Sequence, residues 1–441
     1  MTQVAEKLQP WIAAVEQRPQ DAPRWLQDLR DKAASRFAAL GFPTVRDEDW
    51  RFTNVAPIAS TEFQQAAEAP VAPSDLDALP FSSAAFRLTL VNGRFSAELS
   101  RLDNLPKGVR AGSLAAAATG HGDVVPRYYG QLAEFHGHSF VALNTALAAD
   151  GAYLYIPDGA VIETPIEILF LTAGDPSAVT MAQARTLIVA GERSQVRIVE
   201  TYAALRNGTY FTNAVTEVFA GEGAVIDHYK VQQEGLEAFH VATMQLNAQR
   251  SANVSSHSFS LGGLLVRNDV NAVLDGEGAE VTLNGLYLAD GERLVDNHTV
   301  IDHTKAHCPS HEVYKGILGG RARAVFNGKI IVRQDAQKTD AKQTNRALIL
   351  SDNASINTKP QLEIFADDVK CTHGATIGQL DEEAIFYLRA RGLTQFEARD
   401  MLIHAFAGEV IDRVKIDDLR QGLEAELYAQ LAKDLAELDA A

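Results

Sequence analysis

The stretch from residue 139 to residue 370 constrains the fold most, because it holds many short apolar runs and no amphipathic helix of useful length. Examples are the runs 153–156, 166–171, 186–189 and 196–199, which are rich in β-branched and aliphatic residues. Gly, Asp and Asn separate most of these runs from one another. Short runs bounded by turn residues are typical of β-strands. The middle of the chain is therefore predicted to be all-β.

A turn motif recurs within this stretch. The sequence Gly191-Glu-Arg-Ser194 returns as Gly221-Glu-Gly-Ala224 and as Gly276-Glu-Gly-Ala279, and Asp352-Asn-Ala-Ser355 is a relative. Each turn contains a residue suited to left-handed backbone geometry, then a small residue and an extended run. The spacings are 30 and 55 residues, so the repeat is irregular. This pattern favours the stacked coils of a β-helix, in which each coil buries its face against its neighbours. A large sandwich or jelly roll with similar turns is the alternative.

The N-terminal part has a different pattern. Residues 1–42 are predicted to form two helices, of which the first places Leu8, Trp11, Ile12 and Val15 on one face. Residues 43–84 have no steady period and are predicted to be an irregular connection. A hairpin is predicted over residues 86–99, because Asn-Gly at positions 92 and 93 suits a type I′ turn.

Helical periodicity returns after residue 378. Asp381 can cap one helix, and Thr394-Gln-Phe-Glu397 is a capping-box sequence that begins the next. The final helix carries leucines four residues apart, at positions 419, 423, 427, 431 and 435. This stripe either packs on the protein's own core or presents a ridge to a partner. Three parts are thus expected: a helical region with its connection (1–84), a β-rich core (85–378, with the β-helix mainly over 139–370) and a C-terminal helical region (379–441).

Composition excludes several classes of function. The 441 residues carry a formal net charge of −17, which argues against a nucleic-acid-binding or anionic-membrane-binding protein. No apolar run reaches the roughly 18 residues of a membrane span, and the first residues lack a signal-peptide layout. The two cysteines, Cys308 and Cys371, suit a reducing cytoplasm. The sequence also lacks a P-loop, a dinucleotide-binding fingerprint and a nucleophile elbow, so it does not resemble a self-sufficient ATPase, dehydrogenase or serine hydrolase.

One cluster of reactive side chains is dense enough to suggest a metal site. His298, His303, His307 and His311 lie within fourteen residues together with Cys308. Imidazole and thiolate are good ligands for zinc and iron. In a strand, however, residues four apart lie about 13 Å from each other, which is too far for one ion. Turn or surface histidines are the competing interpretation.

Cys371-Thr-His373 is a more focused candidate. Residues i and i+2 of a strand point to the same face, so the thiol and the imidazole are expected to lie side by side. A nearby imidazolium would favour the thiolate, the form that attacks sulfur or binds a soft metal. Asp367 and Asp368, just upstream, could add oxygen ligands. A small buried cysteine without chemistry is the alternative.

Several sequence blocks resemble the SufB/SufD family, the scaffold subunits of the SUF iron–sulfur cluster assembly machine. The resemblance extends over about residues 45–412, and many separate blocks occur in the family's order. The blocks are Asp49-Trp-Arg-Phe-Thr53, Leu143-Asn-Thr-Ala-Leu147, Tyr314-Lys-Gly-Ile-Leu318, Val325-Phe-Asn-Gly-Lys329, Ala336-Gln-Lys-Thr-Asp-Ala341, Lys359-Pro-Gln-Leu-Glu363, Asp367-Asp-Val-Lys-Cys371-Thr-His-Gly-Ala-Thr376 and Phe386-Tyr-Leu-Arg-Ala-Arg-Gly392. The chain is more similar to the SufD branch, because it lacks the N-terminal cysteine cluster and the greater length that are usual for SufB.

The resemblance implies a mainly β protein with a right-handed parallel β-helix between helical ends. It also implies a subunit without enzymatic turnover, which pairs with SufB and receives the ATPase SufC on its C-terminal helices. Cys371 and His373 match the family's Cys-x-His-Gly motif at the SufB interface, where a transient nascent iron–sulfur cluster is shared. His373 is the better candidate metal ligand, whereas Cys308 matches no fixed cysteine and is interpreted as incidental. No cofactor is expected in the isolated chain, which could also pair with a second copy of itself.

The expected docking surface for SufC lies on the last two helices, about residues 394–438. The candidate partner-binding residues are Thr394, Phe396, Phe406, Leu423 and Leu427. An aliphatic stripe on a terminal helix provides anchors of the i, i+4 type for a partner's groove.

Two alternatives come from other classes of protein. A β-helix carbohydrate-active enzyme would use paired carboxylates, for which Asp335, Asp340 or Asp367 with Asp368 are the candidates. Such enzymes are usually exported, and the aromatic content of 7% offers few sugar platforms. A stand-alone metalloprotein would use the histidines of 298–311, for which no coherent ligand spacing is found.

Overall fold

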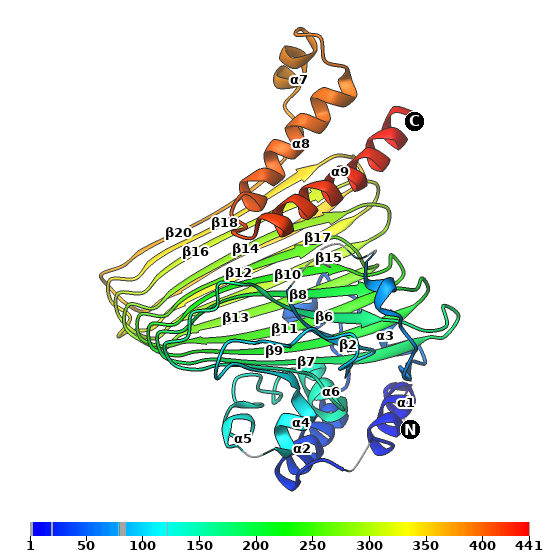
Figure 1. Ribbon diagram of the computed structural model, residues 1–441. Coiled ribbons are helices and arrows are strands. Elements are labelled where there is room, and N and C mark those ends of the chain that lie inside the picture. Colours follow the sequence, from blue (N-terminus) through cyan, green and yellow to red (C-terminus); the bar gives the residue numbers. More distant parts are fainter. Residues whose placement is uncertain (1–2, 19–20, 78, 80–84, 121, 441) are drawn as a thin grey trace.

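The computed structural model describes residues 3–18, 21–77, 79, 85–120 and 122–440, with side chains described from residue 10 to residue 430 of these ranges. Strands make up 40% of the structure and helices 23%, so the predicted mainly β class is confirmed. Two ten-stranded sheets form a β-solenoid of about eight turns with helices at both chain ends (Figure 1). The predicted β-helix between helical regions is therefore confirmed.

The strands alternate between the two sheets, so that successive coils stack in register. Neighbouring long strands within each sheet run parallel, as in the pairing of Leu294–His303 with Arg323–Val332. Sheet A contains β1 (Gln64–Gln65), β4 (Arg110–Ser113), β5 (Ala152–Ile156), β7 (Thr180–Ala190), β9 (Tyr210–Ala220), β11 (Phe239–Ala248), β13 (Leu265–Leu274), β15 (Leu294–His303), β17 (Arg323–Val332) and β19 (Ser355–Ile364). Sheet B contains β2 (Phe86–Val91), β3 (Arg94–Phe95), β6 (Ile166–Thr172), β8 (Gln195–Ala204), β10 (Val225–Gln233), β12 (Asn253–Ser260), β14 (Glu280–Ala289), β16 (Pro309–Leu318), β18 (Asp340–Ile349) and β20 (Lys370–Gly378).

The corner that joins sheet A to sheet B explains the repeated turn. In six successive coils a residue with positive φ is followed by a small buried residue, and these pairs stack along the solenoid. The pairs are Arg193-Ser194, Gly223-Ala224, Ser251-Ala252, Gly278-Ala279, His307-Cys308 and Lys338-Thr339. The spacing of 55 residues in the sequence motif is thus two coils, 28 and 27 residues long, of which the middle corner lacks glycine.

Cys308 occupies the small-residue position of its corner. It is fully buried, and its thiol donates to the carbonyl oxygen of Gly276 at 3.3 Å. Burial raises the pKa of this thiol. A buried thiol in the place where other coils have Ala or Ser is a packing residue, in agreement with its interpretation as incidental.

The N-terminal helices cover the outer face of sheet A. Trp11 of α1 (Gln3–Glu16), Phe37 of α2 (Arg24–Leu40) and Phe140 of α6 (Ser139–Leu147) pack in one apolar cluster with Phe211 and Phe239 of the sheet. The face predicted for the first helix is confirmed for Trp11 and Val15, which are buried, while the side chain of Leu8 lies outside the described residues.

The connection between these helices and the solenoid contains short elements. They are η1 (Glu48–Trp50), α3 (Ala56–Ser60), η2 (Pro73–Leu76), α4 (Leu114–Thr119) and α5 (Val124–Tyr128). The hairpin of β2 and β3 turns at Asn92 and Gly93, both with positive φ, as predicted.

One expectation about the middle of the chain is wrong. Residues 139–147 were expected within the strand region, but they form α6. Residues 140–147 of this helix are all buried. A helix buried on every side has no amphipathic period, so it resembles a buried strand in the sequence. The division of the chain at residues 84 and 378 stays a prediction.

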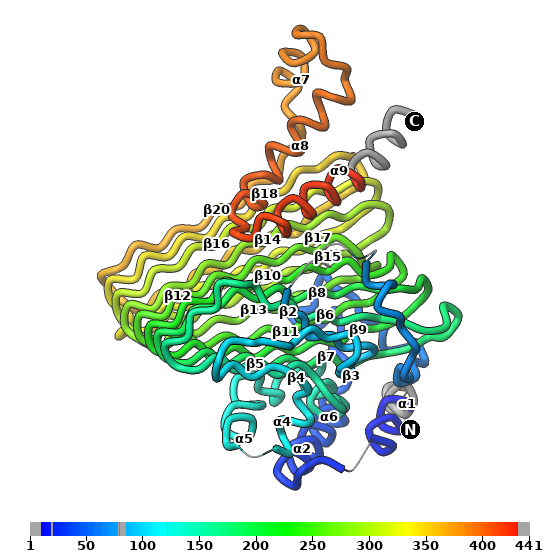
Figure 2. Tube along the Cα trace, viewed as in Figure 1, coloured from blue at the N-terminus to red at the C-terminus, as the bar shows by residue number. Residues whose placement is uncertain are grey.

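The C-terminal helices lie on the opposite side of the solenoid, as the tube in Figure 2 traces. They are α7 (Glu382–Arg389), α8 (Gln395–Ile411) and α9 (Asp417–Ala440). The second half of α8 and the start of α9 pack on the outer face of sheet B, whereas α7 stands away from the sheets (Figure 1). Thr394 and Glu397 form the predicted capping box, and Asp381 caps α7. None of the described helices is long and apolar enough to cross a lipid bilayer.

Candidate functional site

The last coil of the solenoid is an open end. The strands β19 and β20 are the final strands of sheets A and B, and each is paired along one edge only, with β17 and β18 respectively. Within the described part of the chain no other strand pairs with them, and residues 372–377 of β20 are exposed. An unpaired strand edge is a template for association with another chain.

Cys371 and His373 project into this open end. In the parallel pairing with β18, Cys371 is the partner of Ala341 and His373 is the partner of Gln343. Both of these β18 residues are buried in the interior, so their partners on β20 point inward as well. The predicted common face is confirmed, with the two Cα atoms about 7 Å apart along the strand. Cys371 is partly buried against the core, whereas His373 is exposed.

The expected activation of the thiol is wrong for the chain by itself. Burial raises the pKa of Cys371, and the negative charge of Asp340 adds to the rise, although a backbone hydrogen bond from Ala341 opposes it. His373 is not among these causes. Cys371 is therefore disposed to stay a neutral thiol.

The other histidines do not gather around one point. His298 and His303 belong to β15 of sheet A, His307 to a corner and His311 to β16 of sheet B. His303 is buried, with Nε2 3.0 Å from the hydroxyl of Ser310. Among the described residues there is no group of three or more His, Cys, Asp or Glu side chains that could hold a metal ion. The expectation of turn or surface histidines holds for His307, which is exposed at a corner, and is wrong for His303, which is buried in a strand.

Two of the four carboxylates considered for sugar cleavage, Asp340 and Asp368, form surface ion pairs. Asp340 lies 3.3 Å from Lys342, and Asp368 pairs with Lys338. The backbone N–H of Asp368 also donates to Oε1 of Gln337 at 2.9 Å, which closes the corner. These contacts give Asp340 and Asp368 structural partners at the turns.

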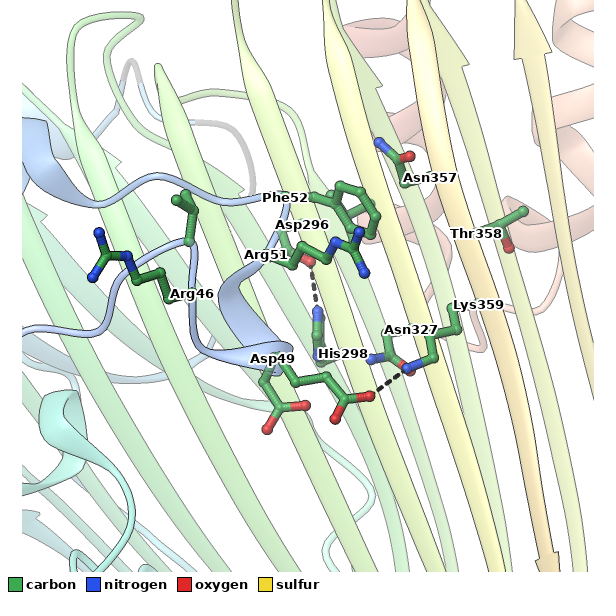
Figure 3. A pocket seen from close by; sticks show the side chains of 13 residues that line it. Arg46, Asp49, Arg51, Phe52, Asp296, His298, Asn327, Asn357, Thr358 and Lys359 are labelled. Atoms are coloured by element: carbon green, nitrogen blue, oxygen red, sulfur yellow. Dashed lines mark hydrogen bonds and ion pairs between the residues drawn. The ribbon is translucent and has the colours of Figure 1, made fainter.

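A second candidate site lies on the outer face of sheet A, beneath residues 45–52 (Figure 3). This cavity of about 560 Å³ is bounded by Arg51, Phe52, His298, Asn327 and Lys359 among others. A smaller cavity of about 370 Å³ adjoins it on the side of Trp50. An ion pair of 2.7 Å between Glu48 and Lys359 ties the segment to β19, the last strand of the sheet.

A buried charge cluster anchors that segment. Asp296 accepts hydrogen bonds from Thr53 and from Arg267, and it lies 3.1 Å from His298. Burial by itself would raise the pKa of Asp296, but the charges of Arg267 and His298 and the hydrogen bonds from His298 and Thr53 outweigh it and lower the pKa to about 2. Arg267 also lies 4.4 Å from the ring of Trp50. The block 49–53 therefore clamps the N-terminal segment onto the sheet.

Sequence reasoning missed Arg267 and Asp296 as partners of this block. The hydrogen bond between Thr53 and Asp296 spans 243 residues. No local period links positions so far apart, so only the tertiary structure reveals the cluster.

The described part of the leucine stripe of α9, Leu419, Leu423 and Leu427, lies inside the protein. Leu423 and Leu427 are each 2% exposed and pack with Leu419 against the outer face of sheet B. They are therefore not a surface for a partner, and of the two interpretations of the stripe the protein's own core is correct. The side chains of Leu431 and Leu435 lie outside the described residues.

The other predicted docking residues are less exposed than expected. Phe396 and Phe406 are partly buried against the same cluster. The ammonium of Lys315 on β16 lies 4.4 Å from the ring of Phe406, donates to its carbonyl oxygen at 2.8 Å and pairs with Glu409 at 2.6 Å. Thr394 is exposed but serves as the helix cap.

Two adjacent exposed aromatic rings lie on α7. Phe386 is 74% exposed and Tyr387 is 56% exposed. Both residues belong to the block 386–392 that resembles the family, and the sequence predicted no role for them. The signal that could have identified them is a pair of large rings on a short helix with a single buried residue, Ile385.

The structure is a β-solenoid of parallel strands, with an unpaired strand edge at its last coil and an inward-facing thiol and imidazole at that edge. Comparison with known families gives the family of this solenoid. The family model described as SUF system FeS cluster assembly, SufBD core domain, matches residues 170–406, and that of the SufBD protein N-terminal region matches residues 16–168. The chain belongs to the SufBD family of iron–sulfur cluster assembly proteins.

Curated relatives support this assignment over most of the chain. An iron-sulfur cluster assembly SufBD family protein of Synechocystis is 36% identical over 405 residues, which cover 90% of this chain and 89% of the relative. The iron-sulfur cluster assembly protein SufD of Escherichia coli is 32% identical over 392 residues, covering 89% and 90%. SufD of Bacillus subtilis is 26% identical over 435 residues, covering 94% and 96%.

Proposed function

We propose that the chain is a non-catalytic scaffold subunit of the SUF system and that it pairs with SufB through the open end of its β-helix. The observation that carries this proposal is the unpaired edge of β19 and β20, which ends the parallel stack without a covering element among the described residues. Parallel coils of a second β-helical subunit would continue the hydrogen-bonding of these edges. In isolation the same edges would take a second copy of this chain.

Iron and sulfur are the cargo of this site. His373 would bind the nascent cluster through an imidazole nitrogen. Cys371 occupies the inward position just before it on the same strand. Both cysteines are free thiols, which fits a protein of the reducing cytoplasm.

The test is His373→Ala in the co-expressed complex with SufB and SufC. Assembly, followed by size-exclusion chromatography, should be intact, and the yield of cluster, followed by anaerobic absorption spectra, should fall. Thr372→Ala is the matched control, since Thr372 is an exposed neighbour on the opposite face of β20. Normal cluster formation in His373→Ala would contradict the ligand role, and failure of the wild-type chain to bind SufB would contradict the pairing.

SufC would dock on α7 and the adjoining start of α8. The argument is the exposure of Phe386 and Tyr387 on a helix that stands away from the solenoid (Figure 1). Aromatic rings that become buried at an interface often dominate its binding energy. Phe386→Ser should therefore lower the affinity for SufC at least tenfold with an unchanged thermal melt. Tyr428→Ser, at an exposed ring of α9, is the control. Equal SufC binding by wild type and Phe386→Ser would place the docking surface elsewhere.

A further inference from the structure

A row of three polar side chains leads from the solenoid interior to His373. Glu312 of β16 pairs in register with Gln343 of β18, which pairs in register with His373 of β20. All three residues therefore face inward on consecutive coils. Parallel neighbours of one sheet lie about 4.8 Å apart, so inward side chains at paired positions of neighbouring coils are within reach of one another.

The first contact of this row sets the direction of the Gln343 amide. Its Nε2 donates to Oε2 of Glu312 at 2.7 Å, and Glu312 and Gln343 are each 1% exposed. The amide oxygen, Oε1, is buried and has no partner among the described residues. Because a buried acceptor without a donor is costly, this oxygen is suited to an N–H from the next coil.

The absence of a side chain at Gly328 leaves the space that the Gln343 amide occupies. A Cβ atom at Gly328 would lie 2.2 Å from Nε2 of Gln343, so the glycine reserves the volume that the amide fills. Gln343 is thereby held by Glu312 on one side and by the space at Gly328 on the other. Two independent features of the interior thus fix one side chain directly beside His373.

We propose that Gln343 is a positioning residue for His373: its Oε1 accepts one imidazole N–H and so directs the other ring nitrogen toward the open end. Imidazoles that bind metals commonly donate their second nitrogen to a carbonyl or carboxylate, which fixes the tautomer and the ring orientation. The consequence for iron rests on the proposed function of His373. The proposed hydrogen bond between Gln343 and His373 does not depend on that function.

The direct test is nitrogen NMR of the full-length chain labelled at histidine, at a pH where the imidazole is neutral. The signals of His373 are identified by their loss in His373→Asn. In the wild type one tautomer should dominate, and in Gln343→Leu both tautomers should be populated. Asn345→Leu is the matched control, because Asn345 is a buried inward amide of the same strand that pairs with Ala375 instead of His373.

A second variant perturbs the row without changing Gln343. Gly328→Ala should displace the amide and give the same mixture of tautomers, which keeps the test decisive where Gln343→Leu melts early. Unchanged tautomer populations in both variants would overturn the positioning role.

Cluster assembly separates this inference from the function on which it rests. In the complex with SufB, Gln343→Leu should weaken Fe²⁺ binding by about 10–100-fold, the usual effect of removing such an outer contact. A change in tautomer populations without any change in Fe²⁺ binding would support the positioning of His373 by Gln343 and would contradict the role of His373 as an iron ligand. Unchanged tautomer populations in both variants would refute the positioning of His373 by Gln343, whether or not Fe²⁺ binding changes.

Discussion

Replacing Glu312 by Gln is expected to stabilise the protein increasingly as the pH rises from 5 to 8. Burial raises the pKa of the Glu312 carboxyl to about 7, although hydrogen bonds from Thr299 and Gln343 oppose the rise. In the unfolded chain the corresponding value is 4.5. An acid whose pKa is raised by folding stabilises the folded state fully when the pH is below its pKa in the unfolded chain. This stabilisation is lost as the pH rises through its pKa in the folded protein.

The cause is the absence of a cation among the described groups that face this carboxyl. Its titratable neighbour is Tyr314 on the same strand, with Tyr287 beyond it. Glu200, elsewhere in the interior, differs: burial alone would raise its pKa, but the hydrogen bond and charge of His228 lower it. An ionised Glu312 therefore has no counter-charge to offset its burial.

The magnitude follows from the two pKa values. The difference between about 7 and 4.5 corresponds to about 3 kcal/mol at about 1.4 kcal/mol per pH unit. Part of this penalty already acts at pH 5, so the free energy of unfolding of Glu312→Gln relative to wild type should rise by about 2–3 kcal/mol between pH 5 and pH 8. Gln is nearly the same shape and keeps an acceptor for Gln343.

Urea denaturation at the two pH values measures this difference. Glu222→Gln, at an exposed corner, removes the same charge from the surface and should change little between the two conditions. An equal effect of Glu312→Gln at pH 5 and pH 8, or a loss of stability at pH 8, would refute the reasoning.

Three further predictions concern the packing of the ends and corners. Leu423→Asp should release the C-terminal helices and lower the thermal melting temperature, since even Leu→Ala at a buried site costs about 2–5 kcal/mol; Ala425→Asp, at an exposed position of the same helix, should leave the melt unchanged in the same circular dichroism experiment. Asp296→Asn should cost about 2 kcal/mol at pH 7, because the lowered pKa of about 2 gives a contribution that is present above the unfolded value of 3.8 and is lost as the pH falls through 2; equal denaturation midpoints of variant and wild type at pH 7 would argue against it. Cys308→Ala should retain stability within about 1 kcal/mol, as Ala fills the same corner elsewhere, whereas Cys308→Leu should lose about 1–3 kcal/mol by overpacking, as read from urea midpoints.

Features that depend on near neighbours could be predicted from the sequence. The strand runs, the turn at Asn92 and Gly93 and the capping box of Thr394 and Glu397 each arise within a few residues, where backbone geometry and local hydrogen bonds decide. The common face of Cys371 and His373 is of the same kind, because side chains alternate along any strand. The repeated corner also indicated the β-helix, although the motif identified only three of the six equivalent corners and missed those at Ser251, His307 and Lys338.

Features that depend on which surfaces meet were decided by the tertiary structure. The leucines of α9 carry the same period whether they face sheet B or a partner, and α6 has no period because it is buried on all sides. The clamp of Thr53 on Asp296 joins residues 243 positions apart.

At the open end, local sequence and tertiary structure each determine part of one site. Glu312, Gln343 and His373 lie 31 and 30 residues apart, and they align only because the intervening coils bring equal positions into register. Coil lengths vary along the chain, with corners 27 to 31 residues apart, so sequence spacing alone does not say which inward residues stack. The local pattern thus determines that a side chain points inward, and the hydrogen-bonded pairing between coils determines what it meets there.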